Sequence, residues 1–422
     1  MEQPSGIPIK KILVESAFAG AIALIIFGPV MGIVLQGYDF NAHLMRPINM
    51  ALLVFFGRTI IEILRASRSQ KSKQKPSAEN TNFLDRIPPQ AQMVIGAAIL
   101  SFLVILPFFM GKYWLSVLNL ALIYVLLGLG LNIVVGLAGL LDLGFVAFYA
   151  VGAYGYALGN QYFGLGFWPA LFLGAGLAGV FGAVLGFPVL RLHGDYLAIV
   201  TLGFGEIIHL VLTNWTEFTG GPNGVSAPAP TLFGLEFRRS AKQGGTPFHE
   251  FFGIDYSAVH RYIFLYLALL VFVIIAIGFV VRLKKMPVGR AWEALREDEI
   301  ACKALGINHV TVKLSAFSLG ATIGGVAGVF FAGFQGFIDP LSFTFFESAL
   351  ILAIVVLGGM GSTAGVVIAA VVLTIAPEFL REFSNYRILI FGLLMVSMMI
   401  WRPRGLVRSK RQKFDLKALS QG

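Results

Sequence analysis

Long apolar runs, repeated along the whole chain, constrain this sequence more than any other feature. Runs of about twenty residues with few charges recur from the N-terminal region almost to the C-terminus. Hydrophobic residues make up 57% of the 422 residues and charged residues only 13%, about half the charged share of a soluble domain. These charges are too few to cover several soluble cores, so the sequence predicts a polytopic membrane protein.

The apolar runs are predicted to cross the membrane as helices. They lack the polar–apolar alternation of β-barrel strands, and only helices or closed barrels satisfy the backbone in lipid. We therefore predict an all-α fold with about 10–12 membrane segments, some of them broken or re-entrant. The first run is too long for a signal peptide and is predicted to be retained. The runs cover residues 12–35, 47–64, 91–110, 115–135, 143–162, 168–190, 196–213, 262–282, 314–335, 345–375 and 386–402.

Basic residues set the predicted orientation. Lys and Arg number six in 65–90, seven in 282–313 and seven from Arg402 onward, whereas 214–261 has four basic and four acidic residues. Because basic loops stay in the cytoplasm, both termini are predicted there and 214–261 is predicted outside. The net charge of +10 is thus explained by topology, and nucleic acid is not predicted as a partner. The predicted divisions are a two-span extension (1–64), a basic linker (65–90), a main membrane domain (91–402) and a basic tail (403–422).

Two glycine clusters are predicted to break apolar runs. If 345–375 crossed the membrane once, the Arg-rich tail would end outside, whereas a break at Gly358–Ser362 returns it to the cytoplasm. Glycine favours such a break because it is costly inside a helix and permissive in a turn. The stretch Gly136–Gly144 is a candidate for a second break. Breaks of this kind usually line a cavity or are buried in protein; the alternative is that both are tight loops at the cytoplasmic surface.

Few charges lie within the runs, and each needs a reason because a charge at membrane depth is costly. Asp142 precedes an apolar run and is predicted either to cap a helix or to lie near a substrate. Glu206 and His209 stand three residues apart on one helix face. They are predicted to line a transport path or, alternatively, to make a satisfied polar contact within the bundle.

Motifs for catalysis are missing from the sequence. The Gly111-Lys112 pair is not followed by Ser or Thr, so no P-loop is present, and neither a zinc-protease nor a hydrolase motif occurs. Cys302 is the single cysteine. No catalytic residue, metal site or cofactor is therefore predicted in this chain. An ion-coupled carrier remains an alternative, although the acidic residues that such carriers use are sparse here.

The basic loop at 283–313 contains the strongest interaction signal. Gly289–Leu305 is predicted to form one amphipathic helix that ends at Gly306, a suitable C-cap. Such a helix can fit a groove on another protein; a solvated loop or a helix on lipid headgroups is the alternative. Its predicted contact residues are Glu293, Ala294, Arg296, Glu297, Glu299, Ala301 and Gly306.

Five sequence blocks, in order along the chain, resemble one family. The blocks are Gly194–Glu206, Thr219–Gly224, Met286–Cys302, Leu357–Ser362 and Trp401–Leu406. They are similar to the LivM-type permease subunits of branched-chain amino-acid ABC importers. This resemblance covers about residues 91–406 and extends to the two-span extension. Glu299–Gly306 is also similar to the coupling motif of ABC importer permeases in general, although Ile300 and Cys302 stand where that motif prefers alanine.

The resemblance implies a division of labour. This chain would be one permease of an ATP-driven importer for leucine, isoleucine and valine in a bacterial inner membrane, in contact with membrane lipid. A second permease, two ATP-binding subunits that hold ATP and Mg, and a periplasmic binding protein would complete the complex, and the loop at 283–313 would dock on an ATP-binding subunit. Related permeases handle urea or other amino acids, which remain alternative substrates.

A translocation path is predicted beside the two breaks. Free N–H and C=O groups at broken helix ends could meet the carboxylate and ammonium groups of an amino acid without a buried side-chain charge. Apolar residues nearby would accommodate a branched side chain. The candidate path residues are Asp142, Phe145, Phe148, Glu206, His209, Leu357, Gly358, Gly359, Gly361 and Ser362.

Overall fold

The computed structural model describes the main membrane domain almost completely and the flanking regions in part. The chain divides into two compact units, Met1–Ala98 and Ile99–Gly422. The predicted span 47–64, most of the linker 65–90, and most of 386–402 and of the tail lie outside the described residues. The described residues are 33–36, 39–42, 89–189, 192, 194–232, 234–237, 239, 245–253, 255–379, 392–393, 396, 400 and 405–407.

The first unit contains a β-hairpin. β1 (Ile33–Gln36) pairs antiparallel with β2 (Asp39–Ala42), with Ile33 opposite Ala42. The predicted end of the first apolar run is therefore wrong, because its last three residues form a strand. β-Branched Ile33 and Val34 favour the strand, since their side chains are restricted in a helix.

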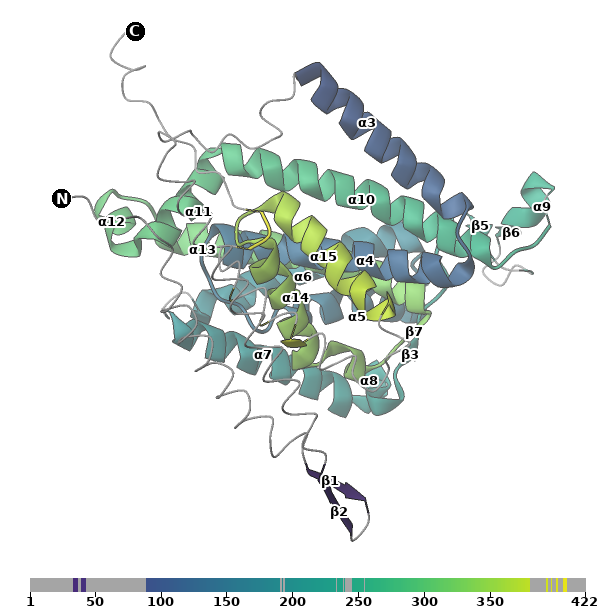
Figure 1. Ribbon diagram of the computed structural model, residues 1–422, viewed down its shortest axis with the longest axis horizontal. Helices are drawn as coiled ribbons and strands as arrows, with labels where there is room; N and C mark the ends of the chain where they lie inside the picture. The colour runs from purple at the N-terminus through teal and green to yellow at the C-terminus, as the bar shows by residue number, and fades with distance from the viewer. Residues whose placement is uncertain are drawn as a thin grey trace. The chain divides into compact units, whose positions relative to one another are not determined.

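Helices form most of the second unit, as Figure 1 shows, and the all-α prediction is confirmed. Six described helices are long and apolar enough to cross a membrane, and Gly96–Phe108 and Thr363–Glu378 are shorter apolar helices. Their ends lie within a few residues of the predicted ones. The helices are α3 (Pro89–Ile105, which begins in the first unit), η2 (Leu106–Phe108), α4 (Lys112–Leu131), the π-helix η3 (Asn132–Leu137), α5 (Val146–Phe163), α6 (Phe167–Val189), α7 (Asp195–Asn214), α10 (Val259–Lys285), α13 (His309–Gln335), α14 (Phe345–Gly358) and α15 (Thr363–Phe379).

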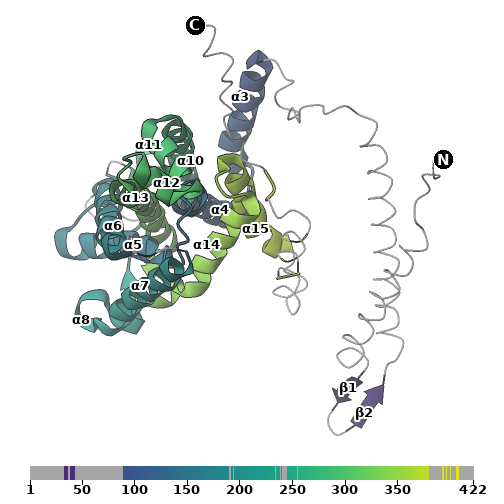
Figure 2. The same cartoon turned by 90° about the vertical axis from the view of Figure 1, so that its left-hand side faces the viewer.

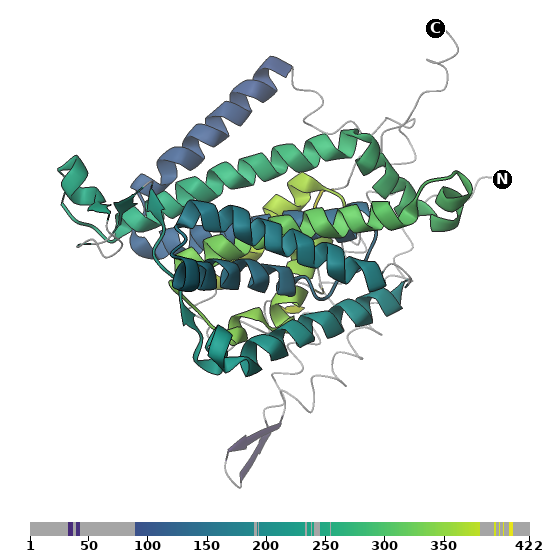
Figure 3. The ribbon, with the colours of Figure 1, turned by 180° about the vertical axis from the view of Figure 1, so that it is seen from behind.

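The core of the bundle forms around α13, which packs against α4, α5 and α6. Figures 2 and 3 show α5, α6 and α13 side by side, with α7 along one edge of this group. Small residues allow the close approach: a Cβ atom at Gly320 of α13 would lie 2.9 Å from the carbonyl oxygen of Gly130 in α4. Without a hydrophobic driving force between helices in lipid, such close backbone packing is a main source of association.

The two predicted long loops lie at opposite ends of this bundle (Figure 1). One end carries α11 (Pro287–Glu297) and α12 (Glu299–Ala304), which connect α10 to α13. The other end carries short elements from the 214–261 segment and the loop after α13. These are α8 (Thr216–Thr219), η4 (Gly221–Asn223), β3 (Val225–Ser226), β4 (Thr231–Leu232), β5 (Leu235–Glu236), β6 (Thr246–Pro247), α9 (Phe248–Phe252), β7 (Phe337–Ile338) and η5 (Pro340–Phe343), with β3 antiparallel to β7, β4 antiparallel to β5 and β5 parallel to β6.

Candidate functional site

The loop at 283–313 folds as two short helices rather than the single helix predicted. α11 ends at Glu297, and Asp298 adopts an extended conformation with φ −157° and ψ 110°. Its carboxylate oxygen Oδ1 then accepts hydrogen bonds from the backbone N–H groups of Ile300 at 2.8 Å and Ala301 at 3.0 Å. Asp is a favoured N-cap residue because it satisfies free N–H groups in the first turn. Asp298 was therefore a sequence signal for a helix start that the amphipathic pattern concealed.

The predicted cap at Gly306 is confirmed. Gly306 has a φ of +79°, and its N–H donates to the carbonyl of Lys303 at 3.1 Å while the N–H of Ile307 donates to that of Cys302 at 3.0 Å. This is the Schellman arrangement, in which a residue with left-handed backbone closes a helix. α12 is thus bounded by Asp298 at one end and by Gly306 at the other.

The two short helices are anchored on one side and open on the other. Trp292 is fully buried, and its Nε1 donates to the carbonyl of Val312 at 3.1 Å and to Ser315 Oγ at 3.0 Å. Buried Lys313 pairs with Glu299 at 2.8 Å. Neither Trp292 nor Lys313 was singled out from the sequence. Of the predicted contact residues, Glu299 is half-buried in this pair, Ala294 is half-buried, and Glu293, Arg296, Glu297, Ala301 and Gly306 are exposed.

The first predicted break lies next to α11. α4 continues into η3, which ends at Leu137, and α5 begins only at Val146. Nη1 of Arg296 donates to the carbonyl of Gly136 at 2.5 Å. Gly139 has a φ of +72°, and a Cβ atom there would lie 2.6 Å from Cγ of Arg296. The backbone after η3 therefore packs directly against a residue of the predicted coupling helix.

The second predicted break is also present. α14 ends at Gly358 and α15 begins at Thr363, with positive φ angles of 104° at Gly359 and 83° at Gly361. The N–H of Gly361 donates to Asn132 Oδ1 at 2.9 Å, and Lys284 Nζ donates to the carbonyl of Gly361. The two breaks therefore meet at the end of the bundle that carries α11, which is the location expected of the tight-loop alternative.

The described part of the tail reaches the same place. The N–H of Leu406 donates to the carbonyl of Leu357 at 2.8 Å, and that of Val407 donates to the carbonyl of Gly358 at 3.2 Å. These bonds satisfy carbonyls that the end of α14 leaves free. Leu406, Val407 and the basic loop therefore lie at one end of the bundle, which agrees with the predicted break at Gly358–Ser362.

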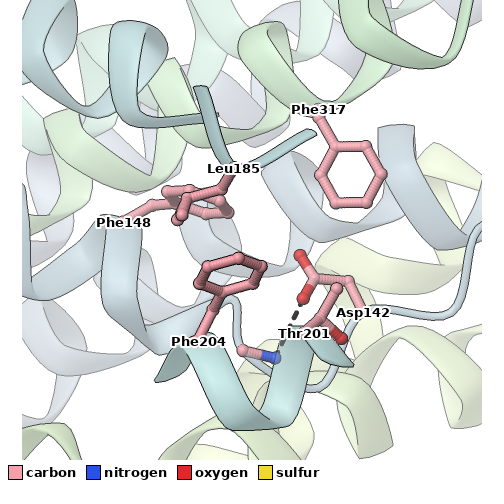
Figure 4. Close-up of a pocket in the computed structure, with 7 residues that line it drawn as sticks. Asp142, Phe148, Leu185, Thr201, Phe204 and Phe317 are labelled. Carbon is pink, nitrogen blue, oxygen red and sulfur yellow. Dashed lines mark hydrogen bonds between the residues drawn. The ribbon is translucent and has the colours of Figure 1, made fainter. Parts of the chain in front are cut away.

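Of the candidate path residues, only Asp142 and Phe148 line the same cavity. It lies between the 142–144 segment and helices α5, α6, α7 and α13, as Figure 4 shows. Phe145 is fully buried elsewhere, against Gly130 and Gly324, and stacks edge-to-face on Phe148 with 5.8 Å between ring centroids. Leu357 is buried beside the tail with Gly358, Gly359, Gly361 and Ser362.

Asp142 does not cap a helix, so that prediction is wrong. The N-cap position of α5 is Phe145, which makes no side-chain cap hydrogen bond. Oδ1 of Asp142 instead accepts from the N–H of Gly144 at 2.9 Å, which fixes the turn before α5. Asp142 is 1% exposed, and its Oδ2 has no hydrogen-bond partner.

Glu206 and His209 lie on α7 but do not form the polar contact offered as an alternative. Glu206 is exposed on the outer face of α7, and the half-buried His209 has an Nδ1 atom without a partner. Among the described residues, no group of three or more His, Cys, Asp or Glu side chains could hold a metal ion.

The apolar bundle, its two broken helices and the pair of short helices beside them define a polytopic membrane transport protein. Residues 113–400 match a family described as the permease component of branched-chain amino acid transport systems. The chain therefore belongs to this permease family. A second family, described only as a domain of unknown function, matches residues 11–106.

Relatives of known name agree with this assignment. The high-affinity branched-chain amino acid transport system permease protein LivM of Escherichia coli (strain K12) is 50% identical over 369 residues, covering 86% of this chain and 87% of that protein. LivM of Salmonella typhimurium is 54% identical over 323 residues, covering 76% of each. LivH, another permease protein of the E. coli system, is 25% identical over 300 residues, covering 67% of this chain and 91% of LivH. No solved structure matches the chain significantly.

Proposed function

We propose that this chain is a permease subunit of an ATP-driven importer for leucine, isoleucine and valine. Its membership of the permease family carries this proposal, and the names of its LivM relatives support the substrate class. In this function, the chain provides a membrane path and binds no nucleotide itself. ATP and Mg belong to two separate ATP-binding subunits, because the sequence has no P-loop.

The end of the bundle with α11 and α12 is the proposed docking site for an ATP-binding subunit. Ile300 and Leu305 are each 79% exposed there, beside the exposed charges of α11. An apolar patch rimmed by charges is typical of a protein interface. Contacts of Arg296 with Gly136 and of Lys284 with Gly361 would pass a movement of this end to both broken helices.

The basic residues at this end of the bundle also indicate how the chain is oriented in the membrane. Seven basic residues in 282–313 support a location of α11 and α12 on the cytoplasmic side of a bacterial inner membrane. The 214–261 segment would then lie in the periplasm, where it would receive the substrate-binding protein. A second permease, related to this one as LivH is, would complete the membrane part, and lipid would cover the remaining apolar surface. Both termini would lie in the cytoplasm.

Uptake of radiolabelled leucine tests the proposal. Cells that contain the neighbouring importer subunits should accumulate leucine with this chain and lose most uptake without it. ATP depletion should stop this uptake, whereas an uncoupler that leaves ATP intact should not. Uptake that follows the ion gradient, or equal uptake with and without the chain, would contradict the proposed function.

A further inference from the structure

The cavity beside Asp142 has the composition of a small ligand site. Aromatic and aliphatic side chains from four helices surround it: Phe148 from α5, Leu185 from α6, Phe204 from α7 and Phe317 from α13. Figure 4 shows the Asp142 carboxylate directed into this apolar space, beside Thr201. An apolar pocket with one or two placed polar groups is the usual form of a small-molecule site.

The carboxylate in this cavity is incompletely satisfied. Oδ1 accepts from the N–H of Gly144, but Oδ2 has no partner, and none of the residues that line the cavity is basic. The hydroxyl of Thr201 is close to the carboxylate, but it also lies 3.1 Å from the carbonyl of Ala198, and its single hydrogen can serve only one of these acceptors. No positive side chain offsets the charge of the buried carboxylate, which is costly. Oδ2 is therefore available to a charged donor on a bound molecule.

We propose that Asp142 binds the α-ammonium group of the transported amino acid during translocation. This inference rests on the proposed function and names a substrate contact within it. A primary ammonium group supplies both the positive charge and the hydrogen-bond donors that Oδ2 lacks. Phe148, Phe204 and Phe317 then surround the branched aliphatic side chain, which gains by leaving water. One carboxylate in an apolar cavity selects a small apolar molecule that carries an amine.

The described conformation is closed around this subsite. The cavity has a volume of about 10 Å³, roughly the room of one water molecule. It is closed by α7, because a Cβ atom at Gly144 would lie 2.0 Å from the carbonyl oxygen of Thr201. The N–H of Leu143 also donates to Oγ1 of Thr201 at 3.0 Å. Entry of an amino acid therefore requires α7 to separate from the 142–144 segment, three residues beyond the contact between Gly139 and Arg296.

Substitution of the carboxylate tests the subsite in the complete complex, reconstituted in liposomes with its partner subunits and leucine-loaded binding protein. Asp142→Asn keeps the acceptor for Gly144 and removes the charge. We expect leucine import to fall by about tenfold or more, as for loss of a buried charged hydrogen bond. Asp339→Asn is the matched control, because Asp339 Oδ1 also caps a turn, accepting from the N–H of Ser342 at 3.0 Å, at the opposite end of the bundle. Its import should stay within about twofold of the unsubstituted complex.

A labelling measurement covers the case in which Asp142→Asn does not assemble. Leu185→Cys, in a Cys302→Ser background, should react with N-ethylmaleimide in the complex during turnover, and leucine should slow this reaction. Normal import by Asp142→Asn would overturn the subsite. So would labelling of Leu185→Cys that leucine does not change, because the carboxylate would then hold only a proton or a buried water. If the unsubstituted complex imports no leucine, the proposed function fails and the ammonium subsite fails with it.

Discussion

The guanidinium of Arg296 donates a hydrogen bond to the carbonyl oxygen of Gly136 at 2.5 Å, and so joins α11 to the last turn of η3. The last four carbonyls of a helix lack partners within it and carry partial negative charge, so a cation there is favourable. Lys284 donates to the carbonyl of Gly361, which lies in the loop between α14 and α15. Two basic residues at the predicted docking end thus bind backbone carbonyls at both breaks.

Arg296 is expected to couple ATP hydrolysis to import. In Arg296→Met the chain loses its bond to Gly136, so a movement of α11 no longer reaches η3. We expect leucine import to fall by about tenfold, the scale of one lost charged hydrogen bond, while ATP hydrolysis by the purified complex continues. The ratio of leucine imported to ATP hydrolysed measures this effect.

Arg290→Met is the matched control for that prediction. Arg290 is exposed on the same helix, and its Nη2 reaches only the carbonyl of nearby Lys285 at 3.4 Å. The Arg290→Met variant should keep the normal ratio of leucine imported to ATP hydrolysed. If the ratio of leucine imported to ATP hydrolysed falls equally in both variants, coupling depends on the positive charge of α11 rather than on the contact of Arg296 with Gly136.

Gly306 is expected to be needed for docking because of its backbone conformation. A Cβ atom at Gly306 meets nothing within 4 Å, so the φ of +79° is the only obstacle to a side chain. Gly306→Val should destabilise the end of α12 by about 1–2 kcal/mol and lower copurification of the ATP-binding subunit. Gly306→Asn should be milder, because Asn tolerates the left-handed region. If the valine variant retains full binding and transport, the docking assignment is wrong.

The positions of the membrane helices were predictable because hydrophobic length alone decides them. α7 and α13 begin and end within a few residues of the predicted runs, and the glycines at 358–361 correctly marked the end of α14. The break inside the coupling loop was missed, because apolar residues on both sides of Asp298 continue one helical pattern. Asp298, directly after α11, is a favoured N-cap residue, but the residue type alone does not show whether it caps a new helix or continues the old one.

The site was less predictable than the helices because its contacts join distant residues. Asp142 meets Thr201 and Phe317 only after α7 and α13 pack beside the turn at 142–144. Phe145 directly precedes α5 and Phe148 lies in its first turn, yet the former fills the core and the latter lines the cavity. Composition marks both residues as apolar and says nothing of which neighbour each one faces.

Labelling in intact spheroplasts tests the orientation. A suitable probe position in the 214–261 segment is Glu250, which is exposed on α9, whereas Ser240 lies outside the described residues. Glu250→Cys, with Cys302→Ser to remove the native thiol, should react with an impermeant thiol reagent before the membrane is opened. Ile300→Cys, 79% exposed on α12, should react only afterwards. The reverse order would invert the proposed topology.

Glu206 occupies a position that would be unfavourable if only lipid covered this face of α7. It lies near the middle of α7 on an exposed face with Ile199 and Ile207, which are 62% and 53% exposed. An acidic group at that depth costs about 2.5–3.5 kcal/mol on the insertion scale. We therefore expect the second permease or a water-filled path to cover this face in the complex, as the candidate path requires.

Glu206→Leu distinguishes these environments. If lipid surrounds the residue, leucine at this position removes the cost of the charge, and both the amount of assembled complex and its import should stay level or rise. If a partner or a path faces it, import should fall by about tenfold, because a polar group opposite loses its partner. Asn214→Leu is the control: Asn214 is exposed at the end of the same helix, where its Nδ2 donates only to the carbonyl of Leu210 at 2.8 Å. Reduced import in Glu206→Leu alone would show that a partner or a path faces this residue, and unchanged import would remove Glu206 from the candidate path.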